Sequence, residues 1–277
     1  MYNILTIGCD FNFDVFNILN CNKLVNINKK NNVPENIKLN PKYIFVEFRT
    51  KNFLNLLKKY NITHVINFLS KDINDLNLVY KLIQECIKYN KIEKFIHVSS
   101  DKILSDRLPD SRLNILTDNN SCFNSCIEII VRTCTLNIII VRSSKLYSQN
   151  INNVITRFIS ILKENKVIEI QGNGSVSIGF LHVKDFCSAL DLILEKGECG
   201  KVYDICPDKT YMILDLAREL CYLFWKDDSS IRFKYTNTNI SSFRLILDNA
   251  KIKNLGWKQK ITLSEGLKKI VTQLNSN

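Results

Sequence analysis

The stretch Lys94-Phe-Ile-His-Val-Ser-Ser-Asp101 decides the fold class of this 277-residue chain. Its short, mainly apolar run, Phe95–Val98, follows a helical pattern at Leu76–Asn90 and precedes a polar turn. A short apolar run between helices is typical of the central strand of a parallel sheet, which helices cover on both faces. Because ligands bind at the carboxyl ends of such strands, we expect Ser99, Ser100 and Asp101 to face a ligand crevice.

Strands and helices alternate along the first half of the chain, which predicts a parallel sheet with right-handed crossovers. The expected strands are Asn3–Ile7, Leu24–Asn28, Tyr43–Glu47, Thr63–Asn67, Phe95–Val98 and Asn137–Val141. The expected helices are Phe13–Leu19, Asn52–Tyr60, Leu76–Asn90 and Ser121–Cys134. The fold class is therefore α/β, a Rossmann-like doubly wound parallel sheet at residues 1–153.

Shorter elements fill the second half, and residues 154–277 are expected to form mainly a smaller C-terminal α/β lobe over the crevice. Its expected helices are Val154–Glu164, Lys184–Lys196, Ile213–Trp225, Asn249–Leu255 and Leu263–Gln273. Its expected strands are Val167–Gln171, Phe180–His182, Lys201–Ile205 and Ile231–Lys234. Gly172-Asn-Gly174 follows a strand but opens no helix, so it favours a hairpin turn over a phosphate-binding loop.

Composition narrows the classes of partner. The net charge is +11, but Lys and Arg form no stripe with interleaved aromatic residues, which argues against a nucleic-acid partner. The ten cysteines include no Cys-x-x-Cys pair, and no His lies at metal-finger spacing, so no metal site is expected. Free cysteines favour a reducing compartment, here the cytoplasm. No signal peptide is visible and no apolar run is long enough to span a bilayer, so no membrane partner is expected.

One predicted helix, Ser121–Cys134, is apolar on most of its circumference. A helix of this kind is buried on more than one side. Because the sheet covers only one of those sides, we predict a dimer that uses this helix together with Leu76–Asn90.

Several motifs resemble those of the extended short-chain dehydrogenases/reductases, the NAD-dependent epimerase/dehydratase family. The clearest are Gly172-Asn-Gly174, Phe180-Leu-His-Val-Lys-Asp185 and Leu247-Asp-Asn-Ala-Lys-Ile-Lys-Asn-Leu-Gly-Trp257. The nearest kin are nucleotide-sugar 4,6-dehydratases that act on dTDP-glucose or UDP-glucose. The resemblance implies NAD or NADP as cofactor and a nucleotide sugar as ligand.

The resemblance places a dinucleotide loop, G-x-x-G-x-x-G, at Gly8, Phe11 and Asp14. Only one glycine of that loop is present, so a ring and a carboxylate replace backbone that should approach the pyrophosphate. Asp14 is then a structural helix cap. The acidic residue that should bind the adenosine ribose is Asn28. The two lysines after it suit either a 2′-phosphate or a solvated loop.

The family's Tyr-x-x-x-Lys pair falls by resemblance on Asn120 and Asn124. Between Lys102 and Lys145 the chain contains neither Tyr nor Lys, so the loss does not depend on that alignment. An Asn amide cannot relay protons near neutral pH.

The family's acid and base after the inner strand correspond to Ser100, Asp101 and Lys102. Lys102 replaces a glutamate, and it is either a surface residue, a partner of Asp101 or a displaced base.

On the substrate side the resemblance implies roles for Lys145, Tyr147 and Arg244. The sequence thus predicts a catalytically inactive relative, a pseudoenzyme with a binding or assembly role, as a homodimer or as a heterodimer with an active relative. The alternative is an active nucleotide-sugar 4,6-dehydratase or epimerase, a lyase-type enzyme, with a rearranged site.

Overall fold

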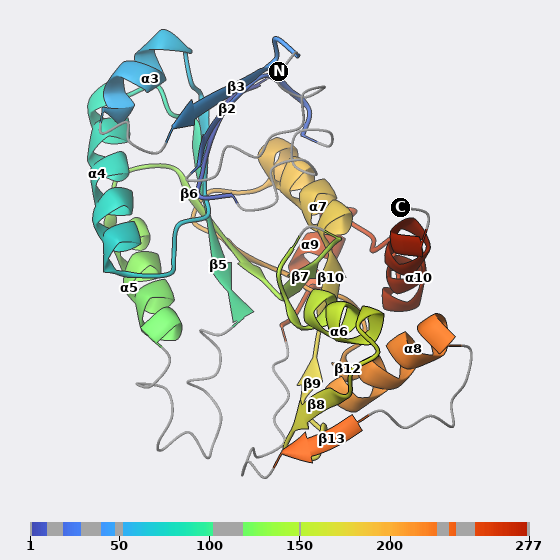
Figure 1. Cartoon of the computed structure of the whole chain (residues 1–277). Helices are drawn as coiled ribbons and strands as arrows, with labels where there is room; N and C mark the ends of the chain where they lie inside the picture. The colour runs from blue at the N-terminus through green and yellow to red at the C-terminus, as the bar shows by residue number, and fades with distance from the viewer. Residues whose placement is uncertain are drawn as a thin grey trace.

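A computed structural model describes residues 2–9, 19–28, 40–47, 52–101, 119–149, 151–225, 233–236 and 247–275, except for the side chains of 119–121 and 275. Within these residues the chain forms one large sheet and a smaller lobe beside it (Figure 1). No helix in these ranges is both long enough and apolar enough to cross a membrane.

The large sheet has seven strands in the order β11-β6-β5-β4-β1-β2-β3, and every neighbouring pair is parallel. Their bounds are β1 (Tyr2–Ile7), β2 (Cys21–Asn28), β3 (Tyr43–Glu47), β4 (His64–Asn67), β5 (Lys94–Ser100), β6 (Ile138–Ser143) and β11 (Val202–Ile205). The inner strands are almost wholly buried, as a parallel sheet requires. The α/β Rossmann-like fold expected from the sequence is therefore confirmed.

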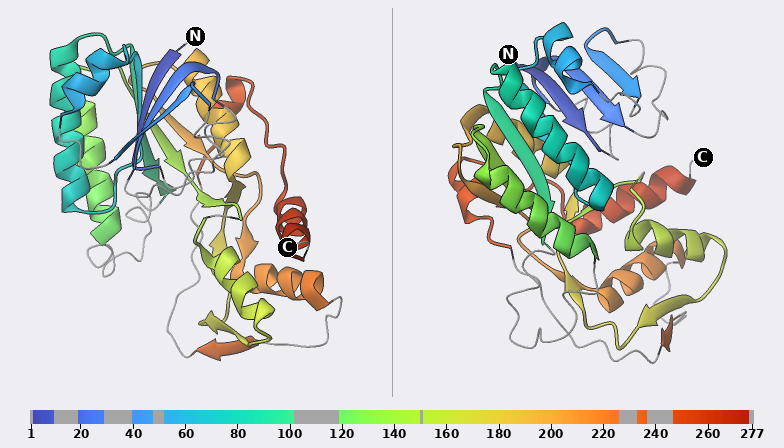
Figure 2. Two further views of the ribbon diagram at one scale, coloured as in Figure 1. Left: turned by 45° about the horizontal axis from the view of Figure 1, so that its top comes forward. Right: turned by 90° about the vertical axis from the view of Figure 1, so that its left-hand side faces the viewer.

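Helices cover both faces of this sheet (Figure 2). One face packs against α3 (Phe53–Lys59), α4 (Ile73–Tyr89) and α5 (Asn119–Thr133), whose apolar side chains form one buried core with alternate residues of the strands. The other face packs against α7 (Val183–Lys196) and α9 (Ala250–Asn254) through a second core. The period-two alternation of strand side chains supplies both cores from the same strands.

The lobe has a third core of its own. It contains α6 (Val154–Lys163), α8 (Ile213–Trp225), α10 (Leu263–Asn275), β7 (Lys145–Tyr147), β8 (Ile168–Gln171), β9 (Ser177–Ile178), β10 (Phe180–His182), β12 (Tyr211–Met212) and β13 (Phe233–Thr236). The strands pair two by two, β10 with β7, β12 with β9 and β13 with β8. Figure 1 shows α6, α8 and α10 gathered beside the carboxyl ends of the sheet strands.

Three features differ from expectation. β5 is an inner strand, but the middle strand of the seven is β4. β11 follows residue 153 but is an edge strand of the large sheet, because it pairs in parallel with β6. α7 and α9 also follow residue 153, and they pack against one face of that sheet. Gly172–Gly174 forms a turn but no hairpin, since β8 and β9 pair with different strands. The expected helix Phe13–Leu19 falls almost entirely outside the described residues.

A buried ion pair fastens α5 to the sheet. The Arg142 guanidinium on β6 donates to both carboxylate oxygens of Glu128, with Nε–Oε1 at 3.0 Å and Nη2–Oε2 at 2.9 Å. Burial alone would raise the pKa of Glu128, but the hydrogen bonds and charge of Arg142 outweigh burial and lower it. The pair therefore holds the inner face of α5 at a fixed position over β5 and β6.

We expect Glu128→Gln to lower the free energy of unfolding by about 3 kcal/mol at pH 7, because it leaves a mostly buried guanidinium without its counter-charge. Denaturant titration measures this change. Since the folded pKa of Glu128 lies below its ordinary value of 4.5, the stabilisation is fully present above pH 4.5 and is lost as the pH falls through the lower value. The matched control is Glu195→Gln on the exposed face of α7, which should change stability by less than about 0.5 kcal/mol. An equal loss in both variants would contradict the role given to the ion pair.

Candidate functional site at the carboxyl edge of the sheet

Four of the sequence-predicted site residues lie at one edge of the sheet. In register, Ile7 on β1 pairs with Ile27 on β2, and Ser100 on β5 pairs with Ser143 on β6. Gly8, Asn28, Ser100 and Asp101 therefore share the carboxyl edge, where open α/β sheets bind ligands.

At the end of β1, the side chain of Leu69 fills the space beside Gly8. Gly8 has a positive φ of 75°, and a Cβ placed on it would lie 2.5 Å from Leu69 Cδ2 and 2.9 Å from Leu69 Cγ. Leu69 is 5% exposed. An apolar side chain thus packs against the first glycine position of the loop, which allows the tight turn after β1.

The side chain of Asn28, at the end of β2, points toward the backbone that follows β1. Its side chain is buried, and its Nδ2 donates a hydrogen bond to the carbonyl oxygen of Cys9. A ribose-binding carboxylate accepts hydrogen bonds from sugar hydroxyls. Asn28 instead stabilises the turn that follows β1.

The end of β5 presents a hydroxyl and a carboxylate. Ser100 Oγ donates to Asp101 Oδ1 at 3.0 Å, and both residues are half-buried. Beneath them, His97 is fully buried, with its Nδ1 at 2.9 Å from the Asn67 amide nitrogen, so this ring nitrogen accepts the hydrogen bond. Burial lowers the pKa of His97 to about 4, against the opposing charge of Glu128, so the ring is neutral at pH 7.

Asn124 lies on the inner face of α5, one helical turn before Glu128, and is 4% exposed. The short amide is enclosed between the helix and the sheet. At this position the resemblance places the lysine of the family's proton-relay pair. The structure therefore shows a buried amide where a cation was expected by resemblance.

A cavity of about 520 Å³ opens in the lobe, and Lys145 is on its wall. Lys145 follows Ser143 by two residues, so this wall begins next to the carboxyl edge of the sheet. Arg157 contributes a second cation and Glu169 a carboxylate. The remaining wall combines apolar side chains, among them Phe158, with the amides of Asn152, Asn153 and Gln171. The cavity combines an apolar surface with an excess of positive charge.

Tyr147 is fully buried in the lobe core rather than on a cavity wall. Its hydroxyl donates to the carbonyl oxygen of Thr262 at 3.3 Å, and its ring meets His182 edge-on with centroids 5.2 Å apart. Burial raises the pKa of this phenol. The contacts of Tyr147 in this structure are those of a core residue.

Four other predicted positions, Phe11, Asp14, Lys102 and Arg244, lie outside the described residues, as does the side chain of Asn120. Among the residues that are described, no group of three or more His, Cys, Asp or Glu side chains could hold a metal ion.

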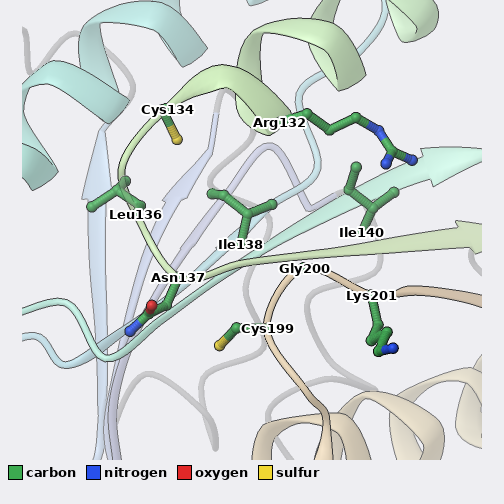
Figure 3. Close-up of a pocket in the computed structure, with 9 residues that line it drawn as sticks. All are labelled: Arg132, Cys134, Leu136, Asn137, Ile138, Ile140, Cys199, Gly200 and Lys201. Carbon is green, nitrogen blue, oxygen red and sulfur yellow. The ribbon is translucent and has the colours of Figure 1, made fainter.

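A second cavity, of about 360 Å³, lies at the opposite end of β6 (Figure 3). Its lining residues are Arg132, Cys134, Leu136, Asn137, Ile138, Ile140, Cys199, Gly200 and Lys201. Because it lies beside the amino ends of β6 and β11, it is separate from the carboxyl-edge site.

Sequence reasoning missed several residues of the site. It did not identify Leu69 as the side chain that packs on Gly8. It assigned no role to Arg157 on α6 or to Glu169 on β8, which line the lobe cavity together with Lys145. Only their alternation with buried neighbours, Phe158 and Ile170, distinguishes them in the sequence.

Comparison with protein families gives a match to the profile described as the NAD dependent epimerase/dehydratase family over residues 51–206. A trifunctional UDP-glucose 4,6-dehydratase/UDP-4-keto-6-deoxy-D-glucose 3,5-epimerase/UDP-4-keto-L-rhamnose-reductase of Arabidopsis thaliana is 30% identical over 233 residues, which cover 78% of this chain. The chain spans only 35% of that plant protein. A dTDP-D-glucose 4,6-dehydratase of Mus musculus is 27% identical, covering 90% of this chain and 78% of its own length.

Solved structures share the fold. The dTDP-glucose 4,6-dehydratase of Bacillus anthracis, in complex with NAD, superposes with a TM-score of 0.83 at 23% identity, covering 100% of this chain and 97% of its own. The UDP-glucose 4-epimerase of Thermotoga maritima, with UDP-glucose, gives 0.79 at 19% identity, covering 99% of both chains.

We expect Gly8→Ala to destabilise the protein by about 2–4 kcal/mol, because the new methyl group meets Leu69 and the residue keeps a left-handed backbone. In a Leu69→Ala background the closest steric contacts, those with Cγ and Cδ2, are removed, so the same substitution should cost only about 1–2 kcal/mol. Urea denaturation of the wild type, both single variants and the double variant measures this coupling. Strict additivity would show that Leu69 does not occupy the space beside Gly8.

Proposed function

The chain belongs to the NAD-dependent epimerase/dehydratase family, and we propose that it is a catalytically inactive member with a binding or assembly role. The observation that carries the proposal is the composition of α5. This helix follows the inner strand β5 and contains neither Tyr nor Lys. Reactions at a sugar carbinol need a group that exchanges protons near neutral pH, and an amide does not.

The cofactor site supports the same proposal. The described residues do not fit a dinucleotide at the end of β1, since Leu69 packs on Gly8 and Asn28 donates to a backbone carbonyl. NAD is the cofactor that family membership implies. We propose that this chain binds NAD or NADP poorly, and we assign no reaction step to either.

The lobe cavity is the part of the site that still suits a ligand. Lys145 and Arg157 supply cations for a diphosphate, and the apolar wall suits a planar base. We propose that the ligand class is a nucleotide sugar, in keeping with the names of the relatives. Tyr147 is fully buried in the lobe core and does not line the cavity, so we propose no direct contact between Tyr147 and the ligand.

The alternative is an active nucleotide-sugar 4,6-dehydratase or epimerase with a rearranged site. The hydrogen-bonded pair of Ser100 and Asp101 favours it, because these two residues keep the side chains expected by resemblance at the carboxyl edge. An ionised Asp101 could accept a proton from a substrate hydroxyl.

We expect calorimetric titration to give a dissociation constant weaker than about 1 mM for NAD and for NADP, because Phe11 and Asp14 replace two of the three loop glycines and Asn28 replaces the ribose-binding carboxylate. Incubation with either cofactor and UDP-glucose or dTDP-glucose should give no 4-keto-6-deoxy product. UDP- or dTDP-glucose alone should bind, and Arg157→Ala should weaken that binding about tenfold or more.

An active dTDP-glucose 4,6-dehydratase run in parallel controls for the assay. Glu164→Ala, on an exposed residue at the end of α6, controls for general effects on the lobe. Micromolar cofactor affinity, or product formation abolished by Asp101→Asn, would favour the rearranged enzyme and contradict inactivity.

Assembly is the second part of the proposal. The outer face of the helix layer carries exposed apolar side chains, Ile73, Tyr80 and Ile87 on α4 and Ile129 on α5, which are 41–62% exposed. The three on α4 are spaced seven residues apart, so they form a stripe along one side of the helix. We propose that this outer face forms a dimer with a second copy or with an active relative, in the cytoplasm.

Replacing Ile129, which is 62% exposed, by Asp should convert a dimer to a monomer, because a charge would then be buried at the interface. Light scattering after size-exclusion chromatography measures the mass. Ile130 is a poor choice, since it packs against the core of the sheet and its loss would also affect folding.

Val167→Asp is the matched control, because Val167 is 50% exposed but belongs to the lobe. A monomeric wild-type protein at micromolar concentration would end the homodimer proposal. Co-purification with an active relative would then test the heterodimer.

A further inference from the structure

Two thiols lie one helical turn apart near the start of α5. Cys122 and Cys126 are four residues apart, so they lie on the same side of the helix. Cys122 is exposed and Cys126 is partly exposed. The pKa of Cys126 is raised by burial first and then by the Cys122 thiol, with which it shares a hydrogen bond. The two sulfur atoms therefore face each other at the surface of the monomer, on the side of α5 that also carries Ile129.

The backbone spacing is compatible with a disulfide. Residues four apart on a helix have Cα atoms about 6 Å apart, within the range of about 4.4–6.8 Å found across disulfides. Their Cβ atoms, about 5–6 Å apart in a regular helix, must approach to about 4 Å. Cys122 is in the first turn of α5, where helices tighten or fray most easily, so this approach needs only a local change.

We propose that Cys122 and Cys126 form a redox-sensitive thiol pair that closes to a reversible intrahelical disulfide when it meets a small-molecule disulfide. The thiolate of Cys122, the more exposed residue, attacks one sulfur of the oxidant. That S–S bond breaks, one thiolate leaves and takes up a proton, and Cys122 carries a mixed disulfide. Cys126 then loses its proton and attacks the Cys122 sulfur, which releases the second thiol. Two cysteine thiols are oxidised and one external disulfide is reduced to two thiols.

The position of the pair gives the modification a consequence. Asn124 lies between the two cysteines in sequence and faces the sheet, and Glu128 follows one turn later. Closing the disulfide changes the backbone at the start of the helix that borders the carboxyl-edge site. Oxidation should therefore alter amide hydrogen exchange in residues 122–128, whatever ligand the site binds.

Another pair of thiols shares a cavity but does not share this geometry. Cys134 and Cys199 both line the cavity of Figure 3, where Cys134 lies beside the end of α5 and Cys199 on the loop that leads to β11. The figure shows the two sulfur atoms well apart across the cavity. Cys134 Sγ also donates to the carbonyl oxygen of Val131 at 3.1 Å. Cys199 is thus a suitable control for the reaction of a single exposed thiol, since it lies on a loop and no second thiol among the described residues faces it.

The test incubates the full chain with oxidised glutathione, alkylates the remaining thiols and maps the peptides by mass spectrometry. We expect the peptide that contains Cys122 and Cys126 to lose two hydrogens and both alkylation sites, and to recover both after reduction. In Cys126→Ser the glutathione adduct should remain on Cys122. Cys199 should carry an adduct in the wild type and in Cys126→Ser, and Cys199→Ser should leave the helix disulfide unchanged.

Circular dichroism of each variant checks that it is folded before oxidation. A wild-type protein that keeps glutathione on Cys122 while Cys126 remains alkylatable would overturn the proposal. A disulfide-linked dimer on a non-reducing gel, formed through Cys122, would overturn it as well, because the partner thiol would then belong to a second chain.

Discussion

The structure depends on one constraint, that a parallel sheet must be covered on both faces. Each inner strand supplies alternate side chains to two cores, one under α3, α4 and α5 and the other under α7 and α9. This requirement fixes the register of β1, β4, β5 and β6, and the register brings Gly8, Asn28, Ser100 and Asp101 to one edge. The position of the site is thus a result of burial, independent of whether any chemistry takes place there.

Polar groups interrupt one of these cores along a narrow stripe. Asn67, His97 and Arg142 all point toward α4 and α5, where Glu128 meets Arg142. Buried polar groups of this kind cost stability unless their hydrogen bonds are made, so they fix one arrangement of helix over sheet. The stripe explains how α5 keeps a defined position over β5 and β6.

The sequence allowed most of the fold to be predicted, because hydrophobic periodicity reports directly on burial. The strands from Asn3 to Val141 and the helices α4, α6, α7 and α8 are found near their expected bounds. β9 and β12, each two residues long, are too short to leave a pattern, and pairing of β11 with β6 joins residues far apart in the chain. The packing of Leu69 on Gly8 and the lobe cavity were beyond reach for the same reason, since both depend on contacts between distant segments. For Phe11, Asp14, Lys102 and Arg244 the sequence prediction stands untested.

The pairing of β11 with β6 has a consequence for how the molecule holds together. After β6 the chain leaves the sheet for the lobe, returns in α7 and β11, enters the lobe again in α8, and comes back through α9 before ending the described structure in α10. Neither part is therefore a continuous length of polypeptide. A fragment cut at residue 153 would lack its edge strand and the helices that cover one face, and would expose the backbone of β6 to pairing with other chains. Because the chain passes between sheet and lobe several times, we expect the two parts to unfold together as one cooperative unit.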